Sequence, residues 1–463
     1  MQLLDSTLRE GELFRVLPRE TRVKVASRLG DAGIRRVELT VDYPPRTAYE
    51  DNVPVIRALL DRGVDVVMHG RATDPDIEAI SRYDVDGCAL YIAVSRLHRE
   101  FKLHGITEEE AVKRLCDGVA KAKDAGFGYI RATMEDASRE YLEEGDPGLE
   151  KLRASSQMLR TAGATLLSLP DTSGLMTPNS ARSLFRKAKS VSSLPLSAHF
   201  HNDYGFASAN TVEAALEGAQ EVHATLMGIG DRNGIADLYE VAATLEDAYG
   251  VRTGIDRRSL RPLYSFFSKA VGLEMNWRHP LSESAQTVRA GVHQSMTVKR
   301  RDGYIPAKKL LYDFGEPLYA ITAYTSHNLV QAILAPYSNI GPEESRRVAE
   351  ALAAKFTGTP LRVQAVREVI MNETGVEVPE HELRRYFASE KLYIMLKLRP
   401  QYPTESLIEG ISALEDVDGV DEVYGDADMV VRAHTPPGRQ SVVSIIRQKY
   451  GGAIEDMKVL VTD

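Results

Sequence analysis

Short β-rich runs alternate with longer helical patterns over the first 250 residues, and this alternation restricts the fold more than any other feature of the chain. Amphipathic patterns typical of helices cover residues 19–32, 108–125, 181–188 and 207–217. Strands are expected at residues 1–4, 36–41, 64–69, 87–93, 129–133, 165–169, 196–201 and 222–227. Strands and helices that alternate through short connections form a parallel sheet.

Eight such units in about 250 residues match a closed (β/α)8 TIM barrel. An open, doubly wound sheet is the alternative, but no Gly-x-Gly-x-x-Gly turn follows the first expected strand. We therefore predict an α/β chain with a TIM-barrel catalytic domain over residues 1–250.

The pattern changes twice after Gly250. Residues 251–389 are mainly helical, and we expect their irregular polar stretch, 299–307, to lie over the open end of the barrel. In residues 390–463, strands are expected at 392–398, 420–424, 429–433 and 454–462, with helices at 404–414 and 438–449. This βαββαβ order is that of a ferredoxin-like fold.

Composition excludes several classes of protein. A net charge of −9 argues against a nucleic-acid-binding protein, which needs a basic surface. Cys88 and Cys116 form no Cys-x-x-Cys pair, so neither a disulfide framework nor a thiolate metal site is expected. No apolar run is long enough to span a membrane, and no signal-peptide pattern follows Met1. We expect a cytoplasmic protein without nucleic-acid or membrane partners.

Two histidines stand at the end of the seventh expected strand, in Ser197-Ala198-His199-Phe200-His201. Residues two apart on a strand face the same side, so His199 and His201 point one way and Phe200 the other. Two imidazoles that converge at a strand end can bind one metal ion. A His-x-His pattern alone is at least as often a pair of satisfied polar residues, so the interpretation depends on the other strand ends.

Polar residues follow five other expected strands, at the end of the barrel where such enzymes carry their chemistry. Gly11, in the first of these segments, is expected to allow an unusual backbone path. Singly, each residue fits a helix cap or a solvated turn, but a converging ring of charges needs partners, a metal or a ligand. The polar residues are Arg9 and Glu10 after strand 1, His69 on strand 3, Arg131, Thr133 and Glu135 on strand 5, Thr172 after strand 6, and the 228–234 segment after strand 8.

Asp5-Ser6-Thr7-Leu8-Arg9-Glu10-Gly11-Glu12 and His199-Phe200-His201-Asn202-Asp203 together resemble the signature of the DRE-TIM metallolyases. Within them, residues 1 to roughly 335 are similar to the Claisen-condensing branch of homocitrate, isopropylmalate and citramalate synthases. The resemblance implies a divalent metal ion (Mg, Mn or Zn) that chelates a 2-oxo acid. It assigns the metal ligands to Glu10, His199 and His201, stabilisation of the developing alkoxide to Arg9, and binding of the carboxylate beside the ketone to Thr172.

The segment Gly228-Ile229-Gly230-Asp231-Arg232-Asn233-Gly234-Ile235 resembles the homocitrate synthase form, with Asp231 in place of the usual glutamate. The residues His69, Arg131 and Thr133 would make a cationic wall that a second substrate carboxylate satisfies. This favours 2-oxoglutarate, and hence homocitrate formation in lysine synthesis. The alternatives are that Arg131 pairs with Glu135 or another acid, and that the substrate is pyruvate, oxaloacetate or 2-oxoisovalerate.

The resemblance also implies acetyl-CoA as co-substrate and an acid–base pair outside the barrel. Ala290-Gly291-Val292-His293 is similar to the family segment with the catalytic histidine, and Tyr304 lies at the spacing of the family tyrosine. With Glu135, these complete the catalytic candidates. The chain departs from the family at Leu13, where glutamine is usual, and at Val288, where histidine is usual. An inactive amino-acid sensor is therefore a further alternative.

Residues 423–431 resemble the glycine-turn-aspartate hairpin in the effector domain of the leucine-responsive regulator family. The helix-turn-helix of those regulators is missing from the chain. We therefore expect residues 390–463 to be an effector domain, with lysine as the effector, in a homo-oligomer (a dimer or larger).

Overall fold

The computed structural model describes residues 1–42, 48–144, 146–305, 317–436 and 439–462. The chain divides into two compact units, Met1–Glu274 and Met275–Asp463. Among the described residues, no helix is both long and apolar enough to cross a membrane.

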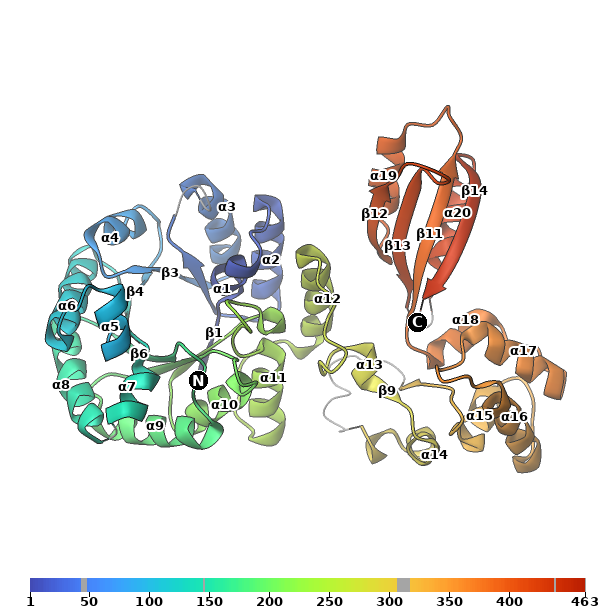
Figure 1. Cartoon of the computed structure of the whole chain (residues 1–463), viewed down its shortest axis with the longest axis horizontal. Helices are drawn as coiled ribbons and strands as arrows, with labels where there is room; N and C mark the ends of the chain where they lie inside the picture. The colour runs from blue at the N-terminus through green and yellow to red at the C-terminus, as the bar shows by residue number, and fades with distance from the viewer. Residues whose placement is uncertain (43–47, 145, 306–316, 437–438, 463) are drawn as a thin grey trace. The chain divides into compact units, whose positions relative to one another are not determined.

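Eight parallel strands of the first unit close into a barrel, in which each strand pairs with the next and β8 pairs with β1 (Figure 1). Most strand residues are buried, as expected for a sheet covered on both faces. The predicted TIM barrel is confirmed. Its strands are β1 (Gln2–Asp5), β2 (Arg36–Thr40), β3 (Asp65–Arg71), β4 (Gly87–Ala93), β5 (Tyr129–Glu135), β6 (Leu166–Asp171), β7 (Leu196–Phe200) and β8 (Glu221–Ala224).

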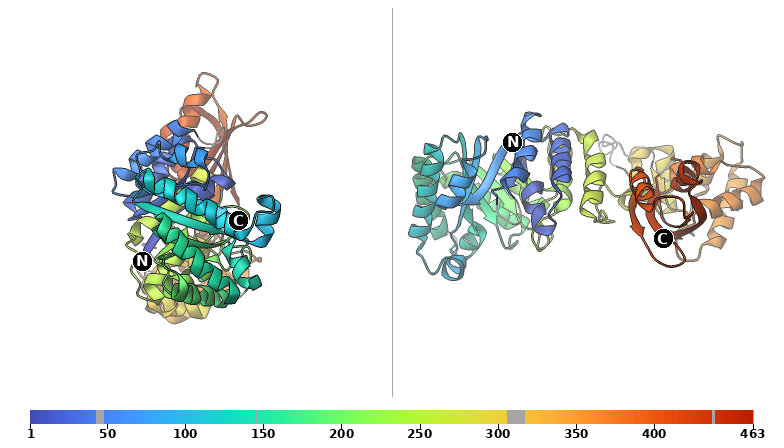
Figure 2. Two further views of the ribbon diagram at one scale, coloured as in Figure 1. Left: turned by 90° about the vertical axis from the view of Figure 1, so that its left-hand side faces the viewer. Right: turned by 90° about the horizontal axis from the view of Figure 1, so that it is seen from above.

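Helices lie outside these strands (Figures 1 and 2). In α6 the side chains of Ala111, Leu115 and Ala122 recur on one face and are buried, while the N-cap Thr107 accepts a hydrogen bond from the backbone of Glu110. The helices are α1 (Thr7–Phe14), α2 (Arg19–Asp31), α3 (Tyr49–Leu60), α4 (Asp74–Ile80), α5 (Arg96–Lys102), α6 (Glu108–Asp124), α7 (Ala137–Glu144), α8 (Asp146–Ala162), α9 (Pro178–Val191), α10 (Ala207–Leu216), α11 (Leu238–Ala243) and α12 (Leu260–Val271).

Two local expectations are wrong. Gly11 does not take an unusual backbone path, because it lies within helix α1 and its φ angle is not positive. Its small size serves packing instead, since a Cβ there would lie 3.1 Å from Cγ2 of Ile229. Strand β8 ends at Ala224 rather than at Met227, because Met227 has a φ of 59° and turns the chain into the following loop.

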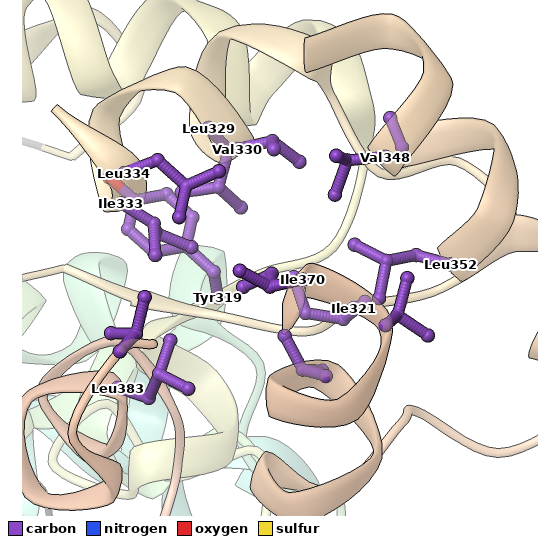
Figure 3. Close-up of a cluster of buried hydrophobic side chains, with 14 of the residues drawn as sticks. Tyr319, Ile321, Leu329, Val330, Ile333, Leu334, Val348, Leu352, Ile370 and Leu383 are labelled. Atoms are coloured by element: carbon purple, nitrogen blue, oxygen red, sulfur yellow. The ribbon is translucent and has the colours of Figure 1, made fainter. Parts of the chain in front are cut away.

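The first part of the second unit is mainly helical. Its core contains Tyr319, Ile321, Leu329, Ile333 and Ile370, whose side chains point toward one another (Figure 3). Residues 306–307 of the expected polar stretch fall outside the described residues. The elements here are α13 (Glu283–Gln286), β9 (Thr287–Val288), α14 (Gly291–Lys299), β10 (Leu318–Tyr319), α15 (His327–Leu334), α16 (Pro342–Lys355), α17 (Val363–Thr374) and α18 (Glu380–Leu383).

The C-terminal part forms a four-stranded antiparallel sheet in the order β12-β13-β11-β14. Leu392, Ile394 and Leu396 of β11 are buried in a core of their own with residues of α19 and α20. This confirms the predicted ferredoxin-like βαββαβ fold; residue 438, where the second helix was expected to begin, lies outside the described part. The elements are β11 (Glu390–Leu398), α19 (Thr404–Ser412), β12 (Val417–Glu422), β13 (Met429–Thr435), α20 (Val442–Tyr450) and β14 (Ile454–Thr462).

Candidate active site at the carboxyl ends of the barrel strands

A cavity of about 440 Å³ lies at the carboxyl ends of the barrel strands and is lined by residues of the first unit. Every site residue that the sequence predicted within the barrel contributes to its wall. The closure of the sheet brings these side chains together from positions up to 192 residues apart, from Arg9 to His201. They are Arg9, Glu10, His69, Arg131, Thr133, Glu135, Thr172, His199 and His201.

Glu10, His199 and His201 converge in this wall. All three are buried, and each offers a ligand atom within 4.8 Å of the others. Oε1 of Glu10 lies 2.6 Å from the Arg9 guanidinium, but Oε2 of Glu10 and Nδ1 of His201 are buried with no hydrogen-bond partner among the described residues. One carboxylate and two imidazoles with orphaned buried atoms fit a divalent metal ion.

Both histidines are in the form that a metal requires. Burial, followed by the nearby His201 and Arg9, lowers the pKa of His199 well below its usual value. Burial is also the largest cause that lowers the pKa of His201, although Glu10 opposes it. The imidazoles are therefore neutral at neutral pH, with a lone pair available for coordination.

Arg9 lies between two carboxylates. Its guanidinium contacts Glu10 at 2.6 Å and also pairs with Glu38, whose Oε2 accepts a 2.8 Å hydrogen bond from Ser6 Oγ. Burial alone would lower the pKa of Arg9, but Glu10 and Glu38 raise it above the usual value. The guanidinium is therefore charged and held in a fixed position beside the three converging side chains.

Arg131 is also paired, and its partner is not Glu135. Its side chain is 2% exposed and forms an ion pair with Glu38, while Nη1 lies 3.6 Å from Oε1 of Glu221. Burial favours the neutral form of Glu38, but the charges of Arg131 and Arg9 hold the pKa of Glu38 well below its usual value. Nε of Arg131 is buried and has no hydrogen-bond partner among the described residues.

Glu135 takes part in a different ion pair. Its carboxylate oxygens lie 2.6 and 2.7 Å from Nζ of Lys102, which also lines the cavity. Lys102 is about half exposed, so this pair lies at the solvent-facing side of the site.

His69 and Tyr91 stack with ring centroids 5.0 Å apart and an angle of 6° between the planes. Burial, and then the charge of Arg9, lowers the pKa of His69 well below its usual value. Thr133 Oγ1 is buried and has no hydrogen-bond partner in the described part of the chain. His69 and Thr133 therefore offer neutral polar groups to the cavity next to Arg131.

Thr172 is fixed by hydrogen bonds to its side chain and to its backbone carbonyl. Its Oγ1 accepts a 2.9 Å hydrogen bond from the backbone N–H of Asp136, and its carbonyl accepts one of 2.8 Å from Arg232. Arg232 also binds both carboxylate oxygens of Asp203, at 2.7 and 2.8 Å. Because Oγ1 acts as an acceptor toward Asp136, its own proton remains available to a substrate carboxylate.

The glycine-rich loop after β8 packs against Glu10. A Cβ at Gly230 would lie 3.3 Å from Oε2 of Glu10 and 3.2 Å from Cα of Gly234. Gly234 has a φ of +76°, and a Cβ there would clash with the carbonyl oxygen of Gly228 at 1.8 Å. Glycine at these two positions therefore lets the backbone approach Glu10 closely.

His293 and Tyr304 belong to the second unit. Their rings stack with centroids 3.9 Å apart and an angle of 26° between the planes. His293 lies on α14, and Tyr304 directly follows the short helix Arg301–Gly303. Their roles in acid–base chemistry stay a prediction.

The sequence analysis missed several charged or polar residues of the site, among them Glu38, Glu221, His223 and Lys102. Glu38, Glu221 and His223 lie within strands β2 and β8, and Lys102 ends helix α5. An alternation along β8 could have revealed two of them. Glu221 and His223 alternate with Val222 on a strand that is buried on both faces. Polar residues at period two in such a strand indicate the inner face of a barrel.

The HMGL-like family matches residues 1–266 of this chain. Homocitrate synthase from Saccharolobus islandicus (strain M.14.25 / Kamchatka #1) is 29% identical over 465 residues, which cover 97% of this chain and 96% of the relative. Homocitrate synthase from Sulfurisphaera tokodaii is 29% identical over 462 residues with the same coverage. The solved structure of HMG-CoA lyase from Bacillus subtilis has a TM-score of 0.51 and 19% identity, covers 59% of this chain and 94% of its own, and shows the shared fold.

Proposed function

Because this chain belongs to the HMGL-like family of DRE-TIM enzymes, we propose that it condenses acetyl-CoA with 2-oxoglutarate to give homocitrate and CoA. The observation that carries this proposal is the convergence of Glu10, His199 and His201 beside the charged guanidinium of Arg9. The names of the relatives that align over 97% of the chain support the choice of reaction.

The carboxylate and the two neutral imidazoles would hold a divalent metal ion. When bound, the ion supplies Lewis acidity to the ketone of a 2-oxo acid that chelates it. Arg9, held between Glu10 and Glu38, would stabilise the negative charge that develops on the ketone oxygen. Thr172 would donate a hydrogen bond from its hydroxyl to the carboxylate next to the ketone.

His293 and Tyr304 would serve as the acid–base pair for removal of the methyl proton of acetyl-CoA. The methyl carbon forms a bond to the ketone carbon, and the proton that leaves the methyl group is balanced by the proton that the new alkoxide takes up. Water then cleaves the thioester and releases CoA and homocitrate. Glu135, paired with Lys102 at the edge of the cavity, is the further candidate for proton transfer.

Specificity for a second carboxylate would come from Arg131, Thr133 and His69. The support is that all three residues line the cavity, and that Nε of Arg131 and the hydroxyl of Thr133 have no hydrogen-bond partner among the described residues. The pairing of Arg131 with Glu38 favours a second candidate, a sister enzyme that uses an oxo acid without a distal carboxylate. In that case the guanidinium would be structural.

Release of free CoA, measured with a thiol reagent, tests the proposal. The substrates are 2-oxoglutarate, pyruvate, oxaloacetate and 2-oxoisovalerate, each with acetyl-CoA and a divalent metal. The highest kcat/KM is expected with 2-oxoglutarate, and a preference for another oxo acid would assign the sister reaction. Absence of turnover with all four, in a protein that still binds metal, would favour the inactive sensor.

We further propose that residues 390–463 form a regulatory domain in a homo-oligomer. The support is that the described residues of this segment fold around a hydrophobic core of their own. Lysine, as the end product of a pathway that uses homocitrate, is the proposed effector.

A further inference from the structure

His223 of β8 is buried between the converging ligands and the ion pairs of Arg131. Its side chain is 2% exposed. On one side, its Nδ1 lies 3.3 Å from Nδ1 of His199. On the other side, its Nε2 lies 3.0 Å from Oε1 of Glu221 and 3.0 Å from Nη1 of Arg131.

The contact between His223 and His199 restricts where their protons lie. In a neutral imidazole one ring nitrogen donates and the other accepts, so two facing nitrogens need opposite roles. Nε2 of His199 is the nitrogen directed toward Glu10, 3.7 Å from its Oε1. If Nε2 of His199 is the metal ligand, its proton must be on Nδ1, and Nδ1 of His223 must accept it.

His223 then carries its own proton on Nε2, which donates to Oε1 of Glu221. Glu221 is suited to accept this bond because it is anionic and held in place. Burial raises the pKa of Glu221, but the hydrogen bond from His223, followed by the charge of Arg131, holds it below the usual value. Tyr129 and Arg36 donate further hydrogen bonds to the same carboxylate, at 2.8 and 2.9 Å.

The opposite arrangement would block the site. If Nε2 of His223 accepted a hydrogen bond from Arg131, its proton would lie on Nδ1 and would be donated to His199. The proton of His199 would then lie on Nε2, where a ligand lone pair is needed. Because a carboxylate only accepts hydrogen bonds, Glu221 favours the proton on Nε2 of His223. This is the arrangement that leaves the lone pair on Nε2 of His199 free to bind a metal ion.

We propose that His223 is a positioning residue of the metal site, which accepts a hydrogen bond from Nδ1 of His199 and so presents Nε2 of His199 as a ligand. This inference rests on the proposed function in one respect, namely that His199 binds a metal ion. Partners of this kind behind a ligating histidine typically change metal affinity about 10- to 100-fold.

Two substitutions separate the roles of the two ring nitrogens. The amide of asparagine occupies the position of Nδ1, so His223→Asn keeps an acceptor for His199. The longer glutamine places its amide near the position of Nε2, so His223→Gln keeps a partner for Glu221 but loses the contact with His199. Each variant is thus the matched control of the other.

The measurement is the affinity of the metal-free full-length protein for Zn²⁺, by competition with a chromophoric chelator. We expect His223→Gln to weaken binding about 10- to 100-fold and His223→Asn to stay within a few-fold of the unsubstituted protein. Equal affinity in both variants would overturn the proposal, because a residue that only fills space has no reason to distinguish the two nitrogens. An unsubstituted protein that binds no Zn²⁺ would overturn the proposed function itself.

A spectroscopic measurement covers the case in which His223→Gln fails to fold. In ¹⁵N-histidine-labelled protein with Zn²⁺, we expect His223 to show a protonated Nε2 and an unprotonated Nδ1. His223→Asn identifies its signals by their loss. A protonated Nδ1 on His223 would contradict the proposal irrespective of the affinities.

Discussion

Arg131 and Glu38 form an ion pair inside the barrel, where their side chains are 2% and 0% exposed. Arg9 shares the same carboxylate, and Glu221 lies 3.6 Å from Arg131. The charge of Arg131 is therefore largely balanced before any substrate enters. Its Nε has no hydrogen-bond partner in the part of the chain that the structure describes, so the role of Arg131 in substrate choice can be tested by substitution.

Replacing Arg131 should distinguish substrates by their distal group. We expect Arg131→Gln to raise KM for 2-oxoglutarate about 10- to 100-fold, since a hydrogen bond to a charged group contributes roughly 1.5–3 kcal/mol. KM for pyruvate should change far less. Steady-state kinetics with both substrates check this, with Lys102→Gln as the control for loss of a cation at the same cavity. Equal effects on both substrates would make Arg131 purely structural.

Removal of the metal should abolish turnover. Treatment with a chelator is expected to stop CoA release, and a divalent ion should restore it. His201→Ala should lose metal, measured by elemental analysis, without loss of the barrel fold, measured by circular dichroism, because His201 lies one residue beyond the end of β7. A His201→Ala protein that is active without metal would refute the ligand assignment.

The acid–base roles predict a separate effect on proton removal. His293→Ala and Tyr304→Phe should slow the overall reaction by about 10²- to 10⁴-fold, the usual contribution of a general acid or base. Metal affinity should not change in either variant. Exchange of the acetyl-CoA methyl protons with deuterium, followed by mass spectrometry, reports the step directly. Full exchange in His293→Ala would assign the base elsewhere, with Glu135 as the first candidate.

Acidification should destabilise the metal-free protein. Four histidines of the barrel have a lowered pKa, chiefly through burial: His69, His199, His201 and His223. In the unfolded chain they titrate near pH 6.5, so below that pH the unfolded state binds protons that the folded state excludes. Stability is then lost as pH falls, by up to about 1.4 kcal/mol per pH unit for each histidine.

Asp5 acts in the opposite direction. Burial raises its pKa from 3.8 to about 7, so the folded state holds a proton in that window that the unfolded state releases. One carboxyl offsets only part of the effect of four imidazoles. We therefore expect Tm of the metal-free protein to fall from pH 7 to pH 5.5, by calorimetry, and His223→Asn to reduce the slope. A Tm that rises on acidification would contradict this charge assignment.

Deleting residues 390–463 should separate catalysis from control. These residues have a hydrophobic core of their own, and the truncated enzyme is expected to keep its kcat. Inhibition by lysine should be lost if it acts through the domain, with a coupling of about 1–3 kcal/mol between the two sites. Full lysine sensitivity in the truncated protein would place control in the active site. An intact enzyme indifferent to lysine would weaken the pathway assignment.

The sequence alone predicted the barrel, the C-terminal fold and the convergence of Glu10, His199 and His201. The two folds and the meeting of polar strand ends follow from short-range rules: side chains alternate along a strand, and parallel strands bring their carboxyl ends to one edge. The choice of Glu10 as the partner of His199 and His201 came from the resemblance to the DRE-TIM metallolyases. Local patterns were less reliable where packing overrides them. Gly11 was expected to bend the chain, but it lies in a helix and makes room for Ile229.

Only the tertiary structure decided which charges pair. Arg131 and Glu38 are 93 residues apart, and His223 reaches His199 across neighbouring strands. Closing the barrel points the inner side chains of β2, β5 and β8 at one another, and the burial that follows requires each charge to find a partner. No local pattern specifies that partner, because it depends on how the whole sheet closes. The sequence therefore indicated the candidate ligands, and the fold determined the network that holds them.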